Sequence, residues 1–169
     1  ERTGITKIAF PPTFKSIGIN SFMNTALIEI TIPNSVRKIK NGAFMNCESL
    51  IKVDLPLSLE KIGNCAFKGC IQLKKIVIQS PLKLIQESTF ENCKSLTRVI
   101  LPNSVVTIEN QAFCECESLN LINIPESLQS IKSNVFKGCK SLTQISFPDS
   151  MKSIGSGAFS QCISLKKIE

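Results

Sequence analysis

The chain has 169 residues, and the 43% that are hydrophobic supply enough apolar material for one folded domain and argue against disorder. Its 20 basic and 13 acidic residues give a formal net charge of +7, which favours solubility first and acidic partners second. There is no amino-terminal signal pattern and no apolar run near the roughly 18 residues of a membrane helix, so neither a targeting peptide nor a membrane span is predicted here.

A repeat with a period of about 23 residues runs through the whole chain. One column of the repeat is phenylalanine and another is leucine. The phenylalanine column comprises Phe22, Phe44, Phe67, Phe90, Phe113, Phe136 and Phe159, and the leucine column comprises Leu27, Leu50, Leu73, Leu96, Leu119, Leu142 and Leu165. These columns predict a solenoid of about seven stacked rungs, in which no rung could fold alone.

Each rung begins with a short strand after the leucine. In the rung that starts at Leu50, the aliphatic residues Val53 and Leu55 alternate with polar ones, which is strand periodicity. Pro56 then ends the strand because proline has no N–H to donate to a sheet. We expect the strands of successive rungs to lie parallel on the concave side.

The second half of each rung returns to the core twice. Leu59 and Ile62, three residues apart, predict a short extended return segment. Ala66 and Phe67 follow in a stretch rich in Asn, Gly, Ser and Lys, which suits one helical or 3₁₀ turn. This turn is expected to form the convex side.

One rung departs from the pattern between its two halves. Gln79-Ser80-Pro81 stands where the other rungs have Pro-x-Ser, so the proline is displaced by two positions. This displacement predicts a local bend or an altered turn.

The full pattern reads Leu-x-x-Ile-x-Ile-Pro-x-Ser-Val-x-x-Ile-x-x-x-Ala-Phe-x-x-Cys-x-x-Leu, with its Ala-Phe-x-x-Cys part seen in Ala158-Phe159-Ser160-Gln161-Cys162. It resembles the BspA-like family of leucine-rich repeats, found in bacteria and protozoa, over essentially the complete chain. The resemblance implies a leucine-rich repeat solenoid. It also implies adhesin-like binding to host components or to other proteins, and a location at the cell surface.

Residues 1–169 are expected to form a single leucine-rich repeat domain. Solenoids need polar caps at their ends, and neither terminus of this sequence carries a recognisable one. We therefore expect the domain to be part of a longer array, or its ends to be covered by a partner.

Six of the eight cysteines form another column, namely Cys47, Cys70, Cys93, Cys116, Cys139 and Cys162. A ladder places its sulfurs in a line, whereas zinc needs four converging ligands and a disulfide needs a torsion that parallel Cβ vectors do not give. The column is therefore predicted to be buried and reduced, and Cys114, outside the column, is the better candidate for an exposed thiol. Unpaired cysteines favour the cytoplasm, which opposes the surface location that the resemblance implies.

Catalysis is disfavoured because the chain has no His, Tyr or Trp and no glycine-rich phosphate loop. The sequence predicts no catalytic residue, no metal, no cofactor and no small-molecule substrate. Binding of nucleic acid is also disfavoured. Single-strand binding needs exposed aromatic rings, whereas the phenylalanines here belong to repeat columns that are expected to be buried.

The candidate binding surface is the concave face. The second and fourth residues after each leucine alternate with the buried positions and so point outward. In three successive rungs the second position is a cation, Lys52, Lys75 or Arg98, and beside these lies an apolar cluster of Val77, Ile100 and Leu121. Like charges on adjacent strands repel, so the stability of the fold does not explain why cations stand at this position in three successive rungs. An apolar centre bordered by cations predicts an interface for a protein partner of acidic character.

Two other functions remain open at this stage. The unpaired cysteines are compatible with an intracellular regulatory or scaffold subunit that acts on an enzyme partner. A structural spacer within a longer array is the third hypothesis, and it expects no role for the concave face.

Overall fold

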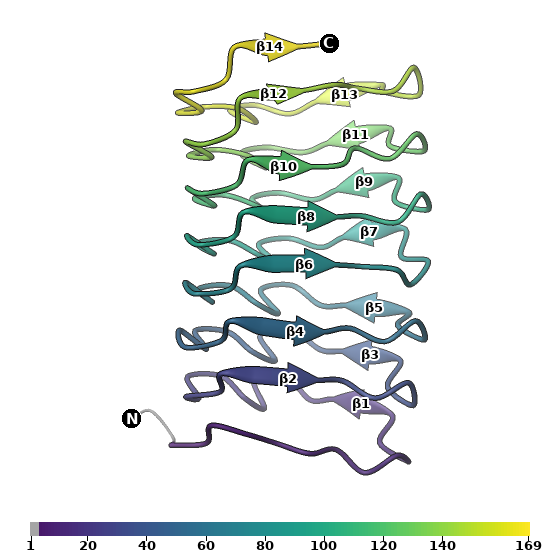
Figure 1. Cartoon of the computed structure of the whole chain (residues 1–169). Coiled ribbons are helices and arrows are strands. Elements are labelled where there is room, and N and C mark those ends of the chain that lie inside the picture. The colour runs from purple at the N-terminus through teal and green to yellow at the C-terminus, as the bar shows by residue number, and fades with distance from the viewer. Residues whose placement is uncertain (1–3) are drawn as a thin grey trace.

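A computed structural model of the chain describes residues 4–169, so residues 1–3 of the expected domain lie outside the described residues. The backbone coils into a stack of rungs with the two ends of the chain at opposite ends of the stack (Figure 1). Even-numbered strands lie on one side, here called the even-strand face. They are β2 (Glu29–Thr31), β4 (Lys52–Asp54), β6 (Lys75–Val77), β8 (Arg98–Ile100), β10 (Leu121–Ile122), β12 (Gln144–Ile145) and β14 (Lys167–Ile168).

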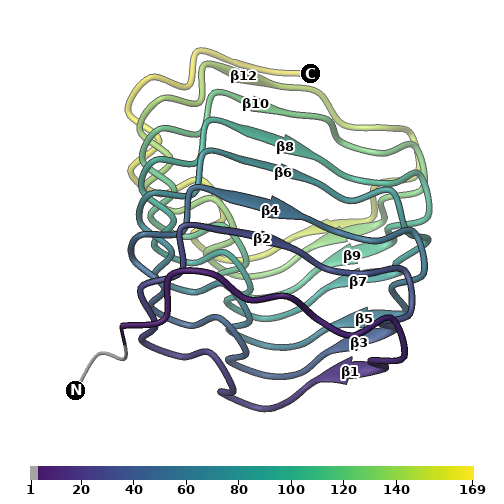
Figure 2. The same cartoon turned by 60° about the horizontal axis from the view of Figure 1, so that its bottom comes forward.

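The return segments form strands of their own on the opposite side, called the odd-strand face (Figure 2). They are β1 (Ser16–Ile17), β3 (Lys38–Ile39), β5 (Lys61–Ile62), β7 (Leu84–Ile85), β9 (Thr107–Ile108), β11 (Ser130–Ile131) and β13 (Ser153–Ile154). Every strand pair is parallel, as between β3 and β5 or β6 and β8. The predicted solenoid of parallel strands is therefore confirmed, and the extended return proves regular enough to make a second sheet.

The core is built from columns of like residues. Phe44, Phe67, Phe90 and Phe113 have no solvent exposure and stack nearly face to face. The rings of Phe44 and Phe67, for example, have centroids 5.2 Å apart and an interplanar angle of 8°. Stacking one rung on the next thus buries each aromatic ring on both faces, which a single rung could not do.

The segments around the phenylalanines are consecutive hydrogen-bonded turns, and no helix occurs in residues 4–169. Met45 N–H donates to Gly42 and Cys47 N–H donates to Phe44, each three residues back. Gly42 and Asn46 have φ values of 64° and 57°, so a left-handed residue stands on either side of Phe44. Such residues prevent a regular right-handed helix from extending here, so a helical turn is not confirmed, although the hydrogen bonds to the third residue back are of the 3₁₀ type.

The cysteine column is buried as predicted, except that Cys162 is only partly buried. Its thiols run along the stack and donate to phenylalanine carbonyls of the preceding rung, for example Cys70 Sγ to Phe44 O at 3.2 Å. The expectation that Cys114 is exposed is wrong, because its side chain is 5% exposed. Cys65 is the more accessible of the two thiols outside the column.

The stack is not equally continuous everywhere. The even-strand sheet is interrupted between β4 and β6 and again between β10 and β12, and the odd-strand sheet is interrupted between β5 and β7. Within residues 4–169, both sheets are broken together only between the rung of β4 and β5 and the rung of β6 and β7. This junction, called the split, is visible as a wider spacing in Figure 1.

The displaced proline explains the split. In the rungs of Ser58, Ser104, Ser127 and Ser150 the serine hydroxyl bonds to a carbonyl of the rung before it, for example Ser104 to Leu82 at 2.7 Å. At the split, Pro81 occupies this serine position and has no hydroxyl to offer. The local turn also tightens, because Leu82 N–H donates to Ser80 two residues back, and the buried Ser80 hydroxyl has no partner. The predicted altered turn is confirmed.

The side of the split that carries the phenylalanine turns stays closed. The Phe67 and Phe90 rings stack with centroids 5.6 Å apart, and the Cys93 thiol donates to the Phe67 carbonyl. Backbone N–H groups of Cys65 and Phe67 also donate to the next rung. The split is therefore a wedge that opens toward both sheets and is held together along the aromatic column.

Candidate functional site

The six residues of the predicted surface all lie on the even-strand face. Lys52 is in β4, Lys75 and Val77 are in β6, Arg98 and Ile100 are in β8, and Leu121 is in β10. The three cationic side chains and Leu121 are exposed, whereas Val77 and Ile100 are half-buried. Between the outward residues, Val53, Ile76 and Val99 are buried, which gives the alternation expected of a strand with one solvent face.

Strand register decides which of these side chains are neighbours. Lys75 is paired with Arg98, and Val77 is paired with Ile100. Leu121 is paired with Arg98, so it extends the line of the cations and not the line of the two β-branched residues. The structure thus brings two cations and three aliphatic side chains together on the three hydrogen-bonded strands β6, β8 and β10.

Lys52 does not belong to this group in the way the sequence suggested. Its Nζ lies 3.1 Å from a carboxylate oxygen of Asp54, two residues along the same strand. That ion pair raises the pKa of Lys52 and leaves its positive charge balanced by the Asp54 carboxylate. The expected stack of three like charges is also wrong, because the split separates β4 from β6 and only Lys75 and Arg98 are on paired strands.

Asp54 was not singled out from the sequence. It accepts a hydrogen bond from the Thr31 hydroxyl at 3.2 Å as well as the ion pair from Lys52. The signal was present, since residues two apart on a strand share a face and opposite charges at that spacing can meet. Lys167 and Glu169 form an ion pair at the same spacing near the other end of the stack.

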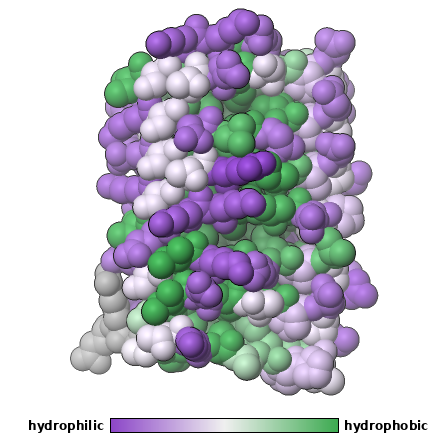
Figure 3. All heavy atoms as spheres, in the orientation of Figure 1, coloured by the Kyte–Doolittle hydropathy of each residue, from purple (hydrophilic) through white to green (hydrophobic). Residues whose placement is uncertain are grey.

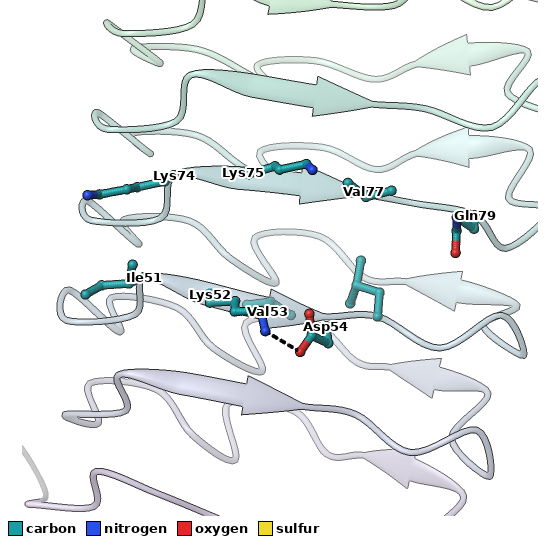
Figure 4. A pocket seen from close by; sticks show the side chains of 9 residues that line it. Ile51, Lys52, Val53, Asp54, Lys74, Lys75, Val77 and Gln79 are labelled. Atoms are coloured by element: carbon teal, nitrogen blue, oxygen red, sulfur yellow. Dashed lines mark ion pairs between the residues drawn. The ribbon is translucent and has the colours of Figure 1, made fainter.

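The split opens a groove on this face. It has a volume of about 430 Å³ and lies between β4 and β6. The lining residues are Ile51, Lys52, Val53, Asp54, Leu55, Lys74, Lys75, Val77 and Gln79. Figure 4 shows Lys52 directed toward Asp54 on one bank, with Lys75 and Val77 on the other. Over the whole face, hydrophobic side chains alternate with hydrophilic ones (Figure 3).

A second hollow on the odd-strand face was not anticipated from the sequence. It has a volume of about 310 Å³, and its lining includes Ile19, Lys38, Lys40 and Lys61. Lys38 and Lys61 are directly paired in register, which places like charges side by side. Lys38 and Lys61 stand 23 residues apart, so the repeat period carried the signal for this pair.

The chemistry available to the even-strand face is that of binding. It offers cations, amides and aliphatic side chains, and it has no nucleophile next to a base. In the described part of the chain, no group of three or more His, Cys, Asp or Glu side chains is placed to hold a metal ion. No helix capable of crossing a membrane is found among residues 4–169.

A coil of short parallel strands with columns of leucine, phenylalanine and cysteine defines a leucine-rich repeat solenoid. The chain belongs to the BspA type leucine rich repeat family, whose model matches residues 1–120 and 83–169. Solenoids of this class are typically not enzymes. A search of curated protein sequences finds no match for the chain.

Three solved structures to which the chain is similar come from bacteria. The leucine rich repeat protein TpLRR of T. pallidum is 32% identical with a TM-score of 0.84, and the match covers 90% of this chain and 72% of that protein. A leucine-rich repeat protein from Eubacterium ventriosum is 30% identical with a TM-score of 0.84. The match covers 89% of this chain and 41% of that one, so the chain spans less than half of its length.

A leucine rich cell surface protein from Faecalibacterium prausnitzii is 30% identical, with a TM-score of 0.78. Here the match covers 97% of this chain and 45% of the other protein. The family and these neighbours together support a general role in protein binding or adhesion.

Proposed function

We propose that the chain is an adhesin-like binding module that recognises a protein partner through its even-strand face. The binding surface is centred on the residues that the strand register brings together, and the partner's complementary surface is acidic. The F. prausnitzii relative is a cell surface protein, which supports an adhesive role. Curved repeat proteins in general bind along such an extended sheet face.

The observation that carries the proposal is the pairing of Lys75 with Arg98 beside Val77 and Ile100. In the described part of the chain neither cation forms an ion pair, and both are exposed. Two like charges on neighbouring strands, about 4.8 Å apart, repel by on the order of 1 kcal/mol even in water, so the pair of cations does not stabilise the free protein. An apolar centre with a cationic border is the usual composition of a protein interface.

The test is affinity capture of a partner by the parent protein, by Arg98→Glu and by Ile100→Asp. Both variants are expected to lose the partner, because each replaces part of the paired group with a charge that an acidic surface repels. Lys132→Glu is the matched control, since Lys132 is exposed and follows β11 on the other side of the molecule.

Thermal denaturation of all four proteins separates lost binding from lost folding. Retention of the partner by Arg98→Glu and Ile100→Asp, with loss in Lys132→Glu, would place the binding surface elsewhere.

A further inference from the structure

We propose that the split is a docking groove for an extended acidic segment of the protein partner, an inference that rests on the proposed function of the even-strand face. The partner's segment lies along the opening of the groove, over the banks formed by β4 and β6. Arg98, Ile100 and Leu121 lie outside the groove and contact the remainder of the partner.

The first argument is the state of the two strand edges. β2 pairs with β4 and β6 pairs with β8, but no pairing joins β4 to β6. At the start of the two strands Lys74 N–H still donates to the Ile51 carbonyl at 3.3 Å. At their far end, where Ile32 N–H donates to Asp54 and Ile78 N–H donates to Ile100 in the intact parts of the sheet, no backbone bond from Leu55 to Val77 spans the split. The Leu55 N–H and Val77 carbonyl at this open end can bond to the main chain of an extended segment, as in β-augmentation.

The second argument is charge. Three lysines line the groove, namely Lys52, Lys74 and Lys75, against the single carboxylate of Asp54. Lys52 and Asp54 pair with each other, which leaves Lys74 and Lys75 without a counter-ion among the described residues. Both ammonium groups belong to the β6 rung, so one bank of the groove is cationic. The occupant that fits this bank carries carboxylates.

The third argument is shape and length. The lining runs from Ile51 to Leu55 on one bank and from Lys74 to Gln79 on the other, with Val53 and Val77 supplying apolar surface. At about 3.3 Å per residue, five residues of extended chain span roughly 17 Å. Lys75 and Val77 share the outward face of β6, so a segment of about this length that presents carboxylates to the lysines and an aliphatic side chain to Val77 fits this lining.

The fourth argument is that the split comes with an unfavourable local structure. The Ser80 hydroxyl is buried without a hydrogen-bond partner, as is that of Ser35 in a Pro-x-Ser turn. The other Pro-x-Ser serines, Ser58, Ser104, Ser127 and Ser150, bond to a carbonyl of the neighbouring rung. The Pro-x-Ser arrangement of Pro56-Leu57-Ser58 would avoid this cost, so stability of the free chain does not account for the departure at residues 79–81.

The experiment uses the full chain and a fluorescein-labelled synthetic peptide of eight residues alternating Glu and Val, with a Lys–Val peptide as its charge control. Fluorescence anisotropy at low and high salt gives the affinity. The parent protein is expected to bind the acidic peptide and not the basic one, and Lys75→Glu is expected to weaken binding about tenfold. Lys132→Glu is expected to bind as the parent does.

The decisive variant is Gln79→Pro/Pro81→Ser, which restores the regular turn and so closes the groove without changing any charge. It is expected to melt at a higher temperature than the parent and to bind the acidic peptide about tenfold more weakly. Val77→Phe fills the groove from the β6 bank and is expected to have the same effect on binding. This second variant decides the question if the first one does not fold.

The outcomes separate this inference from the function on which it rests. Unchanged peptide binding by both groove variants overturns the docking groove, while loss of the captured partner by Arg98→Glu still supports the even-strand face. Failure of the parent to bind the acidic peptide also overturns the inference. Retention of the partner by Arg98→Glu and Ile100→Asp overturns the proposed function itself.

Discussion

Two neighbouring junctions of this solenoid are built from the same columns and yet differ. Between the rungs of β6/β7 and β8/β9, both sheets are continuous, and Ser104 bonds to the Leu82 carbonyl. Between the rungs of β4/β5 and β6/β7, both sheets are open, while the stack from Phe67 to Phe90 is preserved. The aromatic turns therefore hold the rod together, and the sheets close only where the turn between them is regular.

The difference also shows how a repeat protein can acquire a groove without an insertion. Placing a proline at the serine position, with glutamine at the proline position, removes one inter-rung hydrogen bond and changes one turn. The consequence appears on both faces, since a further cavity of about 260 Å³, distinct from the hollow at Lys38 and Lys61, lies between β5 and β7, with Pro81 and Leu82 in its lining. A local change in the sequence thus becomes a change in the stacking of two rungs.

The largest expected effect follows from removing the aromatic contact at the split. Phe90→Ala deletes a fully buried ring that stacks on Phe67 and on Phe113, and the loss of stability is expected to be about 3–5 kcal/mol. Because the sheets do not bridge the split, the two halves of the rod should also unfold in separate steps. Chemical denaturation followed by circular dichroism measures both quantities.

Phe136→Ala is the matched control for that experiment. Its ring is equally buried and stacks on two neighbours, but it lies away from the split. It should lose a similar amount of stability and still unfold in a single transition. Identical unfolding profiles for the two variants would show that the split does not weaken the coupling between its rungs.

A smaller effect is expected from the serine bond at the regular junction. Ser104→Ala removes the hydroxyl that donates to Leu82, and a loss of about 1 kcal/mol is expected. Hydrogen exchange should also accelerate at the Val106 amide, which donates to Lys83 across the same junction. Ser35→Ala serves as the control because the Ser35 hydroxyl is buried without a partner, so its removal should leave stability unchanged or slightly higher. Equal losses of stability in the two variants would show that the serine hydrogen bond is not what closes the sheets at the regular junction.

The smallest expected difference is in the alkylation of the buried cysteines on the closed side of the split. Burial raises the pKa of the Cys93 and Cys116 thiols well above the ordinary value of 9.0. Alkylation requires the thiolate, so neither should react at pH 8, although Cys93 lies beside the split and Cys116 does not. Mass spectrometry after iodoacetamide treatment should find Cys65, which is partly exposed, modified first. Faster labelling of Cys93 than of Cys116 would mean that the aromatic side opens as well.

The same pKa shifts set a direction for stability against pH. Because the folded-state pKa of each buried thiol is raised, the contribution of the column is fully present below the ordinary value of 9.0. It is lost as the pH rises above that value, since the unfolded chain then ionises thiols that the folded chain keeps protonated. Denaturation at pH 8 and pH 9.5 should show a lower free energy of unfolding at the higher pH.

The repeat pattern determined the fold from the sequence alone, because each column of the solenoid is one position of the repeat. The phenylalanine, leucine and cysteine columns are buried where the period placed them, apart from the partly buried Phe22, Phe159, Cys162 and Leu165 near the ends of the stack, and Gln79-Ser80-Pro81 marked the altered turn. The outward positions of Lys75 and Arg98 followed from the two-residue period of a strand.

What only the tertiary structure decided depends on contacts between rungs and on φ values that residue types do not fix. Left-handed residues around Phe44 replaced the expected helical turn, and Cys114 proved buried. Lys52 was drawn to Asp54 and separated from Lys75 by the opening of the sheet. The groove itself could not be read from the sequence, because its volume comes from the distance between two rungs, and that distance is set by the packing of the turns on either side.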